Sequence, residues 1–261
     1  MIQANLLAGM PQRVQIVIPG ADLPAGAAWS LVWEVNGFAG IPRGGSGVGT
    51  GEQVVLVDAG CPVGAPVTYT LRVSGVTTSS VMVTRAFGGG SILADLSAET
   101  IVGFGWYGDD PREGARRVHI SDVPGSRRPP LRYAAPGDGG GSLTAVTTRP
   151  ATDSLRALLA SGEPLLLLHN LADCQIPGCD VPPSEMVYVT SDGNARTGAV
   201  TAAERAWALS YLLAADPEPG WREPTSTWDD LDAADLTWDQ VDAKALTWDA
   251  FDRTDWSQVG A

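Results

Sequence analysis

The fold of this chain is decided by the stretch Trp29-Ser30-Leu31-Val32-Trp33-Glu34-Val35, in which every second side chain is large and apolar. A period of two predicts a strand with one face in a core, because successive side chains of a strand point to opposite sides. The same alternation recurs on either side of it, in Val14, Ile16 and Ile18 and in Val67, Tyr69, Leu71 and Val73. Turns rich in Gly and Pro separate the runs, which together predict a β-sandwich over residues 1–87.

The amino-acid composition also favours a mainly β fold. The chain has 261 residues, of which 44% are apolar and 18% charged, as in folded globular proteins, and its 31 Gly and 19 Pro favour short strands over long helices. We expect a mainly β chain with two β-sandwich-like domains, at 1–87 and 88–217, and an acidic arm of short helical turns at 218–261.

One short helix is predicted in the second domain. It begins near Pro150, with Thr152 and Asp153 as possible caps, and Gly162 and Pro164 stop it. The strands expected around it are 142–148, 164–169, 185–190 and 206–213, with a turn at 191–194.

The C-terminal arm carries a ten-residue unit three times, beginning at Thr227, Thr237 and Thr247. Each Thr can cap a short helix, and the following Trp shares a face with an apolar residue three positions on. Such turns are marginal alone, which favours docking of the arm on another subunit or a neighbouring protein. Folding back on its own body, or a disordered end, are the alternatives. The predicted interaction residues are Trp228, Leu231, Trp238, Val241, Trp248, Phe251 and Trp256.

Charge is unevenly distributed. Residues 216–261 hold 12 acids against Arg222, Lys244 and Arg253, which is -9 of the total -13. An acidic arm repels nucleic acid, so we expect no nucleic-acid partner. Apolar runs such as Leu165 to Leu168 are far shorter than the roughly 18 residues of a membrane helix, and no basic and apolar leader is evident, so we expect neither membrane insertion nor a secretory signal.

Six arginines crowd between positions 112 and 132. Two interpretations stay open: a solvated loop face, or a surface that pairs with acidic groups through bidentate guanidinium contacts. The arginines are Arg112, Arg116, Arg117, Arg127, Arg128 and Arg132.

His169, Cys174 and Cys179 form the strongest candidate for a chemical site, with Asp180 directly after them. These donor types suit zinc, although the spacing matches the usual finger pattern only in part. A disulfide between Cys174 and Cys179 is a second possibility. Reduced, partly buried thiols are the third, and they are the expectation, with no metal and no cofactor.

Enzyme signatures are weak. Residues 103–108 formally match a dinucleotide fingerprint, but Trp106 and Tyr107 stand where a helix should open. Asp109 and Asp110 could serve glycoside cleavage, yet adjacent acids in such a loop are usually solvated. We expect no enzymatic activity and no catalytic residues.

Three stretches resemble one protein family. The run from Val57 to Leu71, with its Tyr69, is similar to the N-terminal domains of minor tail proteins of actinobacterial siphophages and to the tyrosine-bearing strand of fibronectin type III modules. The stretch from Leu155 to Leu168, followed by Tyr188-Val189 and Trp207-Ala208-Leu209, resembles the second domain of distal-tail-like minor tail proteins. The threonine-tryptophan-aspartate repeat resembles tails of actinophage minor tail proteins.

This resemblance implies a virion structural protein of the tail tip, assembled in the host cytoplasm. It implies a homo-oligomeric ring or trimer around the tail axis, contacts with tail-tube and hub proteins, and no catalysis. The competing class is a host-surface carbohydrate-binding or receptor-binding module, for which the candidate platforms are Trp29, Trp33, Trp106 and Tyr107.

Overall fold

The computed structural model describes residues 1–108, 111–115, 118–120, 131–133, 137–197, 203–215 and 240, with the backbone alone at 115, 118–120, 131–133 and 137–138. The chain divides into two compact units, Met1–Ala214 and Ala215–Ala261. The mainly β prediction is confirmed, because the described residues form antiparallel sheets and one α-helix. The boundary predicted near residue 87 stays a prediction.

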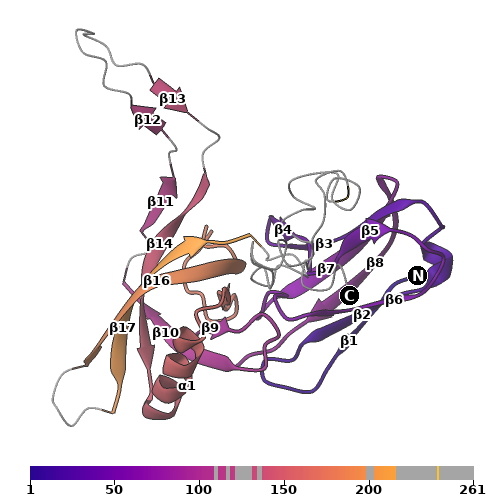
Figure 1. Ribbon diagram of the computed structural model, residues 1–261. Coiled ribbons are helices and arrows are strands. Elements are labelled where there is room, and N and C mark those ends of the chain that lie inside the picture. The colour runs from indigo at the N-terminus through magenta and orange to yellow at the C-terminus, as the bar shows by residue number, and fades with distance from the viewer. Residues whose placement is uncertain are drawn as a thin grey trace, which may run out of the picture. The chain divides into compact units, whose positions relative to one another are not determined.

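The N-terminal region consists of two packed sheets (Figure 1). The first has the order β1-β2-β6, and the second has the order β4-β3-β7-β8, with β5 also paired to β3. The strands are β1 (Gln3–Leu6), β2 (Val14–Ile18), β3 (Ala28–Val35), β4 (Phe38–Gly40), β5 (Ser46–Val48), β6 (Val54–Asp58), β7 (Pro66–Val73) and β8 (Val76–Thr84), with a 3-10 turn at Gly20–Asp22.

The alternating side chains of these strands form one core, as their period predicts. The buried cluster combines Val14, Ile16 and Ile18 of the first sheet with the inward residues of the second. Those are Trp29, Leu31, Trp33, Val35, Val67, Tyr69 and Leu71.

A buried arginine follows the last of these strands. Arg85 is completely buried and donates to the backbone carbonyls of Gln12, Ala59 and Cys61, the bond to Ala59 measuring 3.0 Å. Nearby, the Tyr69 hydroxyl donates to the buried Asp58 carboxylate at 2.7 Å. Complete burial raises the pKa of Asp58, while the Tyr69 hydroxyl and the Arg85 charge oppose that rise. Arg85 thus joins three segments at the exit from the N-terminal region.

The second region is a seven-stranded antiparallel sheet with the order β10-β9-β15-β16-β17-β14-β11. Strand β10, the first in this order, also pairs with β14, the sixth. These six strands therefore form a closed sheet. The strands are β9 (Ser91–Ala94), β10 (Ile101–Tyr107), β11 (Arg112–Ala115), β14 (Gly137–Thr147), β15 (Leu165–Leu168), β16 (Ser184–Arg196) and β17 (Arg205–Leu213).

Strand β15 is buried on both faces. Leu165 and Leu167 pack into the core of the closed sheet, with Trp207 and Leu209 of β17. Leu166 and Leu168 point the other way, into a cluster with Ala59 and Val63 of the N-terminal region and with Ile92 and Ala94 of β9. Strands β9 and β15 therefore join the two regions, which is why residues 1–214 form one compact unit.

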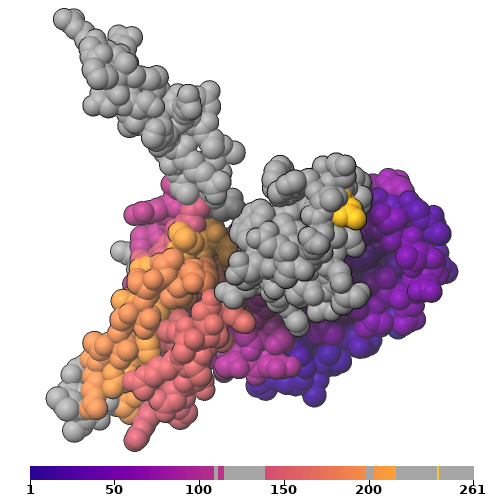
Figure 2. Space-filling view, in the orientation of Figure 1, coloured from indigo at the N-terminus to yellow at the C-terminus, as the bar shows by residue number. Residues whose placement is uncertain are grey.

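The α-helix α1 (Arg149–Ala160) covers the closed sheet with Leu155 and Leu158. In the space-filling view the segment containing it, in salmon, lies directly beside β16 and β17, in orange (Figure 2). The predicted caps are wrong, because the helix begins at Arg149, and Thr148 occupies the cap position without a side-chain hydrogen bond.

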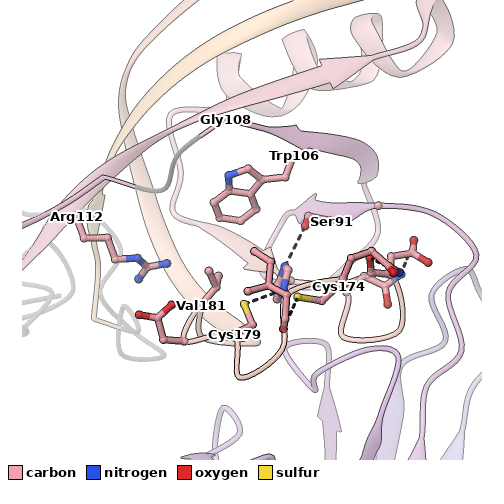
Figure 3. A pocket seen from close by; sticks show the side chains of 14 residues that line it. Ser91, Trp106, Gly108, Arg112, Cys174, Cys179 and Val181 are labelled. Carbon is pink, nitrogen blue, oxygen red and sulfur yellow. Dashed lines mark hydrogen bonds between the residues drawn. The ribbon is translucent and has the colours of Figure 1, made fainter.

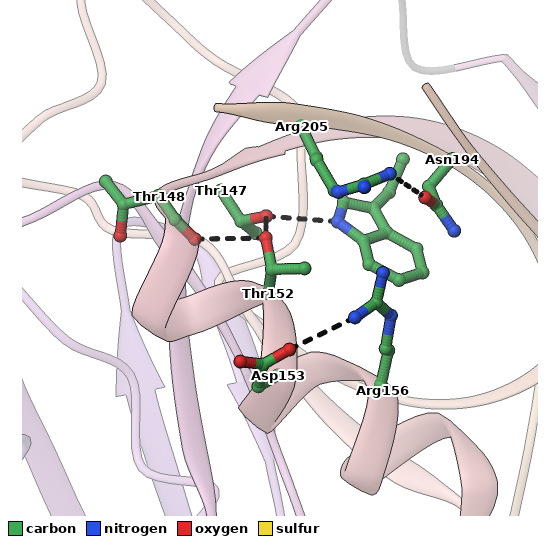
Figure 4. A network of polar contacts seen from close by, with 8 residues as sticks. Thr147, Thr148, Thr152, Asp153, Arg156, Asn194 and Arg205 are labelled. Atoms are coloured by element: carbon green, nitrogen blue, oxygen red, sulfur yellow. Dashed lines mark hydrogen bonds and ion pairs between the residues drawn. The ribbon is translucent and has the colours of Figure 1, made fainter. Parts of the chain in front are cut away.

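Thr152 lies instead in the first turn of the helix, in a buried polar network (Figure 4). Its hydroxyl bonds to the Thr148 carbonyl at 3.0 Å and to the Thr147 hydroxyl at 2.9 Å. The Trp207 indole N–H donates to Thr147 Oγ1 at 3.0 Å, and Arg156 lies over the Trp207 ring, 6.0 Å from its centroid. The network holds the start of the helix against β17.

The predicted turn at 191–194 is also wrong. Strand β16 continues through these residues to Arg196, with Asp192 opposite Leu209 and Asn194 opposite Trp207. The register shifts between Val189 and Ser191, and this irregularity takes up Thr190 without ending the strand.

Beyond the closed sheet, β14 continues into a two-stranded ribbon with β11, and β12 (Val118–Ile120) pairs with β13 (Leu131–Tyr133) further along the same antiparallel course (Figure 1). Arg112 lies opposite Gly141, Ala115 opposite Gly137, and Val118 opposite Tyr133. We call β11, β12, β13 and residues 137–141 the basic ribbon, because residues 112–141 carry six arginines and three acids.

We expect Arg85→Met to lower the free energy of unfolding by about 3 to 5 kcal/mol, because it removes the donor to three carbonyls and leaves Asp58 buried without its counter-charge. Denaturant unfolding at neutral pH measures the change. Arg72→Met is the matched control, since the pair of Arg72 with Glu34 is exposed, at 3.7 Å, and should contribute about 0 to 1 kcal/mol. Equal losses in the two variants would contradict the role of Arg85.

Candidate functional sites

Three potential metal ligands lie together on the loop between β15 and β16. The donor atoms of His169, Cys174 and Cys179 are all within 4.8 Å of one another, and each residue is half-buried. The Cys179 sulfur is 3.7 Å from His169 Nε2. The residues singled out by their spacing in the sequence thus meet in space, and both cysteines are free thiols rather than a disulfide.

Sheet register places His169 beside residues from far earlier in the chain. Leu168 is opposite Ile92 on β9, so the next residue, His169, comes to lie next to Ser91. The Ser91 hydroxyl is 3.5 Å from His169 Nδ1. On the neighbouring strand β10, the Trp106 ring meets the imidazole edge to face, with centroids 6.1 Å apart.

A tight turn returns the chain from Cys174 to Cys179. The Cys179 N–H donates to the Ile176 carbonyl at 3.2 Å across Pro177 and Gly178. Gly178 has φ +69°, and Pro followed by a residue of positive φ is the signature of a type II turn. The turn between the two cysteines therefore reverses the chain and brings the two thiols close together.

The start of this loop is anchored to the N-terminal region. Asn170 is buried, and its side-chain amide donates to the backbone carbonyls of Phe87, at 3.2 Å, and Gly89. The Leu171 N–H donates to the Val63 carbonyl at 3.2 Å. The cluster consequently sits where the N-terminal sandwich meets the closed sheet.

A pocket of about 640 Å³ opens beside the cluster (Figure 3). Its walls come from β9, β10, the base of the basic ribbon and the loop after β15, and they include Ser91, Trp106, Gly108, Arg112, His169, Asn170, Asp173, Cys174, Cys179, Asp180 and Val181. Asp180, a possible fourth ligand from its position in the sequence, lines the pocket but is not a member of the three-donor group.

The thiol of Cys179 is perturbed by its position. Desolvation raises its pKa above the ordinary value, and the neighbouring Cys174 and the Asp180 charge add to the rise. A bound cation would reverse this balance, because a coordinated thiol gives up its proton.

The basic ribbon is the second candidate site. Strand β11 is the last strand of the seven-stranded order, and β12 and β13 pair with each other alone, so within the described residues their outer edges have no strand partner. Such edges offer unpaired backbone donors and acceptors to another chain.

Of the six arginines singled out by the sequence, Arg112 is the one whose side chain is described. Its guanidinium contacts the Glu185 carboxylate on β16 at 2.6 Å, which fixes the base of the ribbon to the sheet. Arg112 is therefore engaged within the molecule. The side chains of Arg116, Arg117, Arg127, Arg128 and Arg132 lie outside the described residues.

Two of the aromatic residues considered as binding platforms are core residues. Trp29 and Trp33 are each 7% exposed and belong to the sandwich core. The sequence that matches a dinucleotide fingerprint forms β10, an antiparallel strand paired with β9 and β14, rather than a turn that opens a helix. The geometry at these positions gives no nucleotide site.

The remaining candidates fall outside the described residues: Asp109, Asp110, and the arm residues Trp228, Leu231, Trp238, Val241, Trp248, Phe251 and Trp256. Among the helical residues that the structure describes, none forms a helix long and apolar enough to cross a membrane. A scan against protein-family models finds no matching family, and a comparison with curated proteins finds no matching relative.

In the presence of a chelator, a thiol reagent should label two of the three cysteines in the folded protein and the third only after unfolding. Cys174 and Cys179 line the pocket, whereas Cys61 is completely buried and burial raises its pKa to about 12. Mass spectrometry of the digested, labelled protein identifies the sites. Labelling of Cys61 alone after unfolding would reveal a disulfide and contradict the free thiols.

Proposed function

We propose that this chain is a structural component of a siphophage tail tip, of the distal-tail or minor-tail kind. It joins copies of itself and binds tail-tube and hub proteins through its β regions and its C-terminal arm. The proposal is motivated by the resemblance of three stretches to such proteins: residues 57–71, the stretch that begins at Leu155, and the C-terminal repeat. The mainly β architecture is compatible with it.

The observation that carries the proposal is the basic ribbon. An isolated two-stranded hairpin is marginally stable in water, because it has little apolar surface to bury and one ladder of hydrogen bonds. In the described residues the ribbon pairs only within itself and at its base, through β14. A second chain that covers or extends it would supply the missing contacts, which is the arrangement expected of a subunit in a larger assembly.

Charge gives the ribbon a suitable partner. Residues 112–141 carry a net charge of +3, whereas residues 216–261 carry -9. Arginine pairs strongly with carboxylates, so the acidic arm of one copy is the partner that we propose for the ribbon of another. Burial of the arm's tryptophans would add a stabilisation of about 25 cal/mol for each Å² of apolar surface removed from water.

The competing function is binding to a host-surface carbohydrate or receptor. One observation favours it: Tyr107 is 70% exposed, and its neighbour Trp106 lines the pocket. Adjacent residues of a strand point to opposite faces, however, so these two rings do not form one platform. Assembly is therefore the function that we retain.

Shortening the ribbon should prevent assembly without unfolding the body. Residues 116–136 can be replaced by Asn-Gly, because Ala115 lies opposite Gly137 and Asn-Gly favours a two-residue hairpin turn. We expect light scattering to show an oligomer for the full chain and a monomer for this variant, with similar thermal unfolding of the body. A full chain that stays monomeric together with purified tail-tube and hub proteins would contradict the proposal.

Replacing Trp228, Trp238 and Trp248 by alanine should also abolish assembly, because it removes the apolar anchors of the arm. Light scattering at rising salt separates the two contributions, since exposed charge pairs weaken as the screening length falls. If the unmodified chain loses the oligomer at high salt, ion pairs between the arm and the ribbon hold the assembly together. If assembly does not depend on salt, the tryptophans alone hold it together. Full assembly of the triple variant would exclude the arm as a docking element.

A further inference from the structure

We propose that His169, Cys174 and Cys179 bind a Zn²⁺ ion at the wall of the pocket. Two thiolates and an imidazole are a donor set that zinc prefers, while carboxylate-seeking ions such as Mg²⁺ and Ca²⁺ avoid it. The site does not depend on the proposed assembly role, because it is argued from the geometry of the described residues alone.

The spacing of the donors fits a tetrahedral ion. Zn–S bonds of about 2.3 Å and Zn–N bonds of about 2.0 Å place neighbouring ligand atoms roughly 3.5 to 3.8 Å apart. The Cys179 sulfur and His169 Nε2 are 3.7 Å apart, and all three donor atoms lie within 4.8 Å of one another. Closing the remaining gap requires only small side-chain rotations.

The surroundings of His169 support ligation through Nε2. That nitrogen faces Cys179, whereas Nδ1 faces the Ser91 hydroxyl at 3.5 Å. A ligating imidazole keeps its proton on the other nitrogen and donates it to a nearby oxygen, which orients the ring. Ser91 is buried and fixed on β9, so it is a positioning residue for the ligand.

The loop is held in the binding geometry by contacts that need no metal. The type II turn at Pro177 and Gly178 returns Cys179 to Cys174, and the buried Asn170 fixes the start of the loop to the carbonyls of Phe87 and Gly89. A site already arranged in this way loses little conformational entropy on binding. The three protein donors leave the fourth tetrahedral position to a water molecule from the pocket.

A bound ion would link the outer part of the loop to the place where the N-terminal region packs against the closed sheet. His169 extends from β15, which both cores share, and the cysteines stand at the outer part of the same loop. Zinc would therefore stabilise the folded state by mass action, raising the temperature of thermal unfolding.

The experiment measures metal in full-length protein purified without chelator. We expect about one zinc per chain by elemental analysis. Replacement by Co²⁺ should give the visible absorption bands of a tetrahedral thiolate site. Removal of the ion by a chelator should lower the unfolding temperature, and added Zn²⁺ should restore it.

Variants assign the ligands. Cys174→Ser, Cys179→Ser and His169→Asn should each lose the zinc and the cobalt bands, while Ser91→Ala should weaken zinc affinity by about 10-fold, as outer-sphere changes do. The matched controls are Cys61→Ala and His119→Asn, the other cysteine and the other histidine of the chain, and both should keep the ion.

Three results would overturn the site. The first is that the protein has two reactive pocket thiols but takes up neither Zn²⁺ nor Co²⁺. The second is a disulfide between Cys174 and Cys179 in protein purified without oxidant. The third is that the control variants lose as much metal as the ligand variants. Comparison of the far-ultraviolet spectra of all variants ensures that metal loss does not merely reflect unfolding.

Discussion

The two-sided burial of strand β15 is the constraint on which the structure of residues 1–214 depends. Leu165 and Leu167 need the interior of the closed sheet, whereas Leu166 and Leu168 need the cover supplied by Ala59 and Val63. Fully burying a leucine contributes about 1.5 to 3 kcal/mol, so neither face can be left to water without a large loss. The N-terminal sandwich therefore covers the face of β15 that points away from the interior of the closed sheet.

That constraint also sets the position of the pocket. The residues immediately after β15 must leave the seam between the regions, and Asn170 is bonded there to backbone carbonyls that follow the N-terminal sandwich. On the other side, Arg85 holds the carbonyls of Ala59 and Cys61, just before Val63 pairs with Asn170. Burial in the core and hydrogen bonds at the seam thus place His169 against Ser91 of β9.

Local patterns in the sequence were sufficient where local physics decides the outcome. Period-two alternation predicted the core faces of Trp29 to Val35 and of Val67 to Leu71. The strands expected at 164–169 and 206–213 are present as β15 and β17. The extent of β16 could not be predicted, because Asp192 and Gly193 favour a turn until pairing with β17 keeps them extended. The spacing of His169, Cys174 and Cys179 indicated a cluster, but Ser91 and Trp106 join it through strand register, which a single sequence does not reveal.

Strand β14 belongs to both the basic ribbon and the wall of the closed sheet. Its first residues pair with β11, and from Gly140 to Thr147 it pairs with β17, where any side chain at Gly140 would meet the Tyr211 carbonyl at 2.2 Å. Because the strand is continuous, tension applied along the ribbon would load the β14–β17 hydrogen bonds in shear, all at once rather than one after another. Such a ladder resists mechanical pulling well. Its inner end, at Thr147, is bonded to Trp207 and Thr152, so the force would end on helix α1 and the core beneath it.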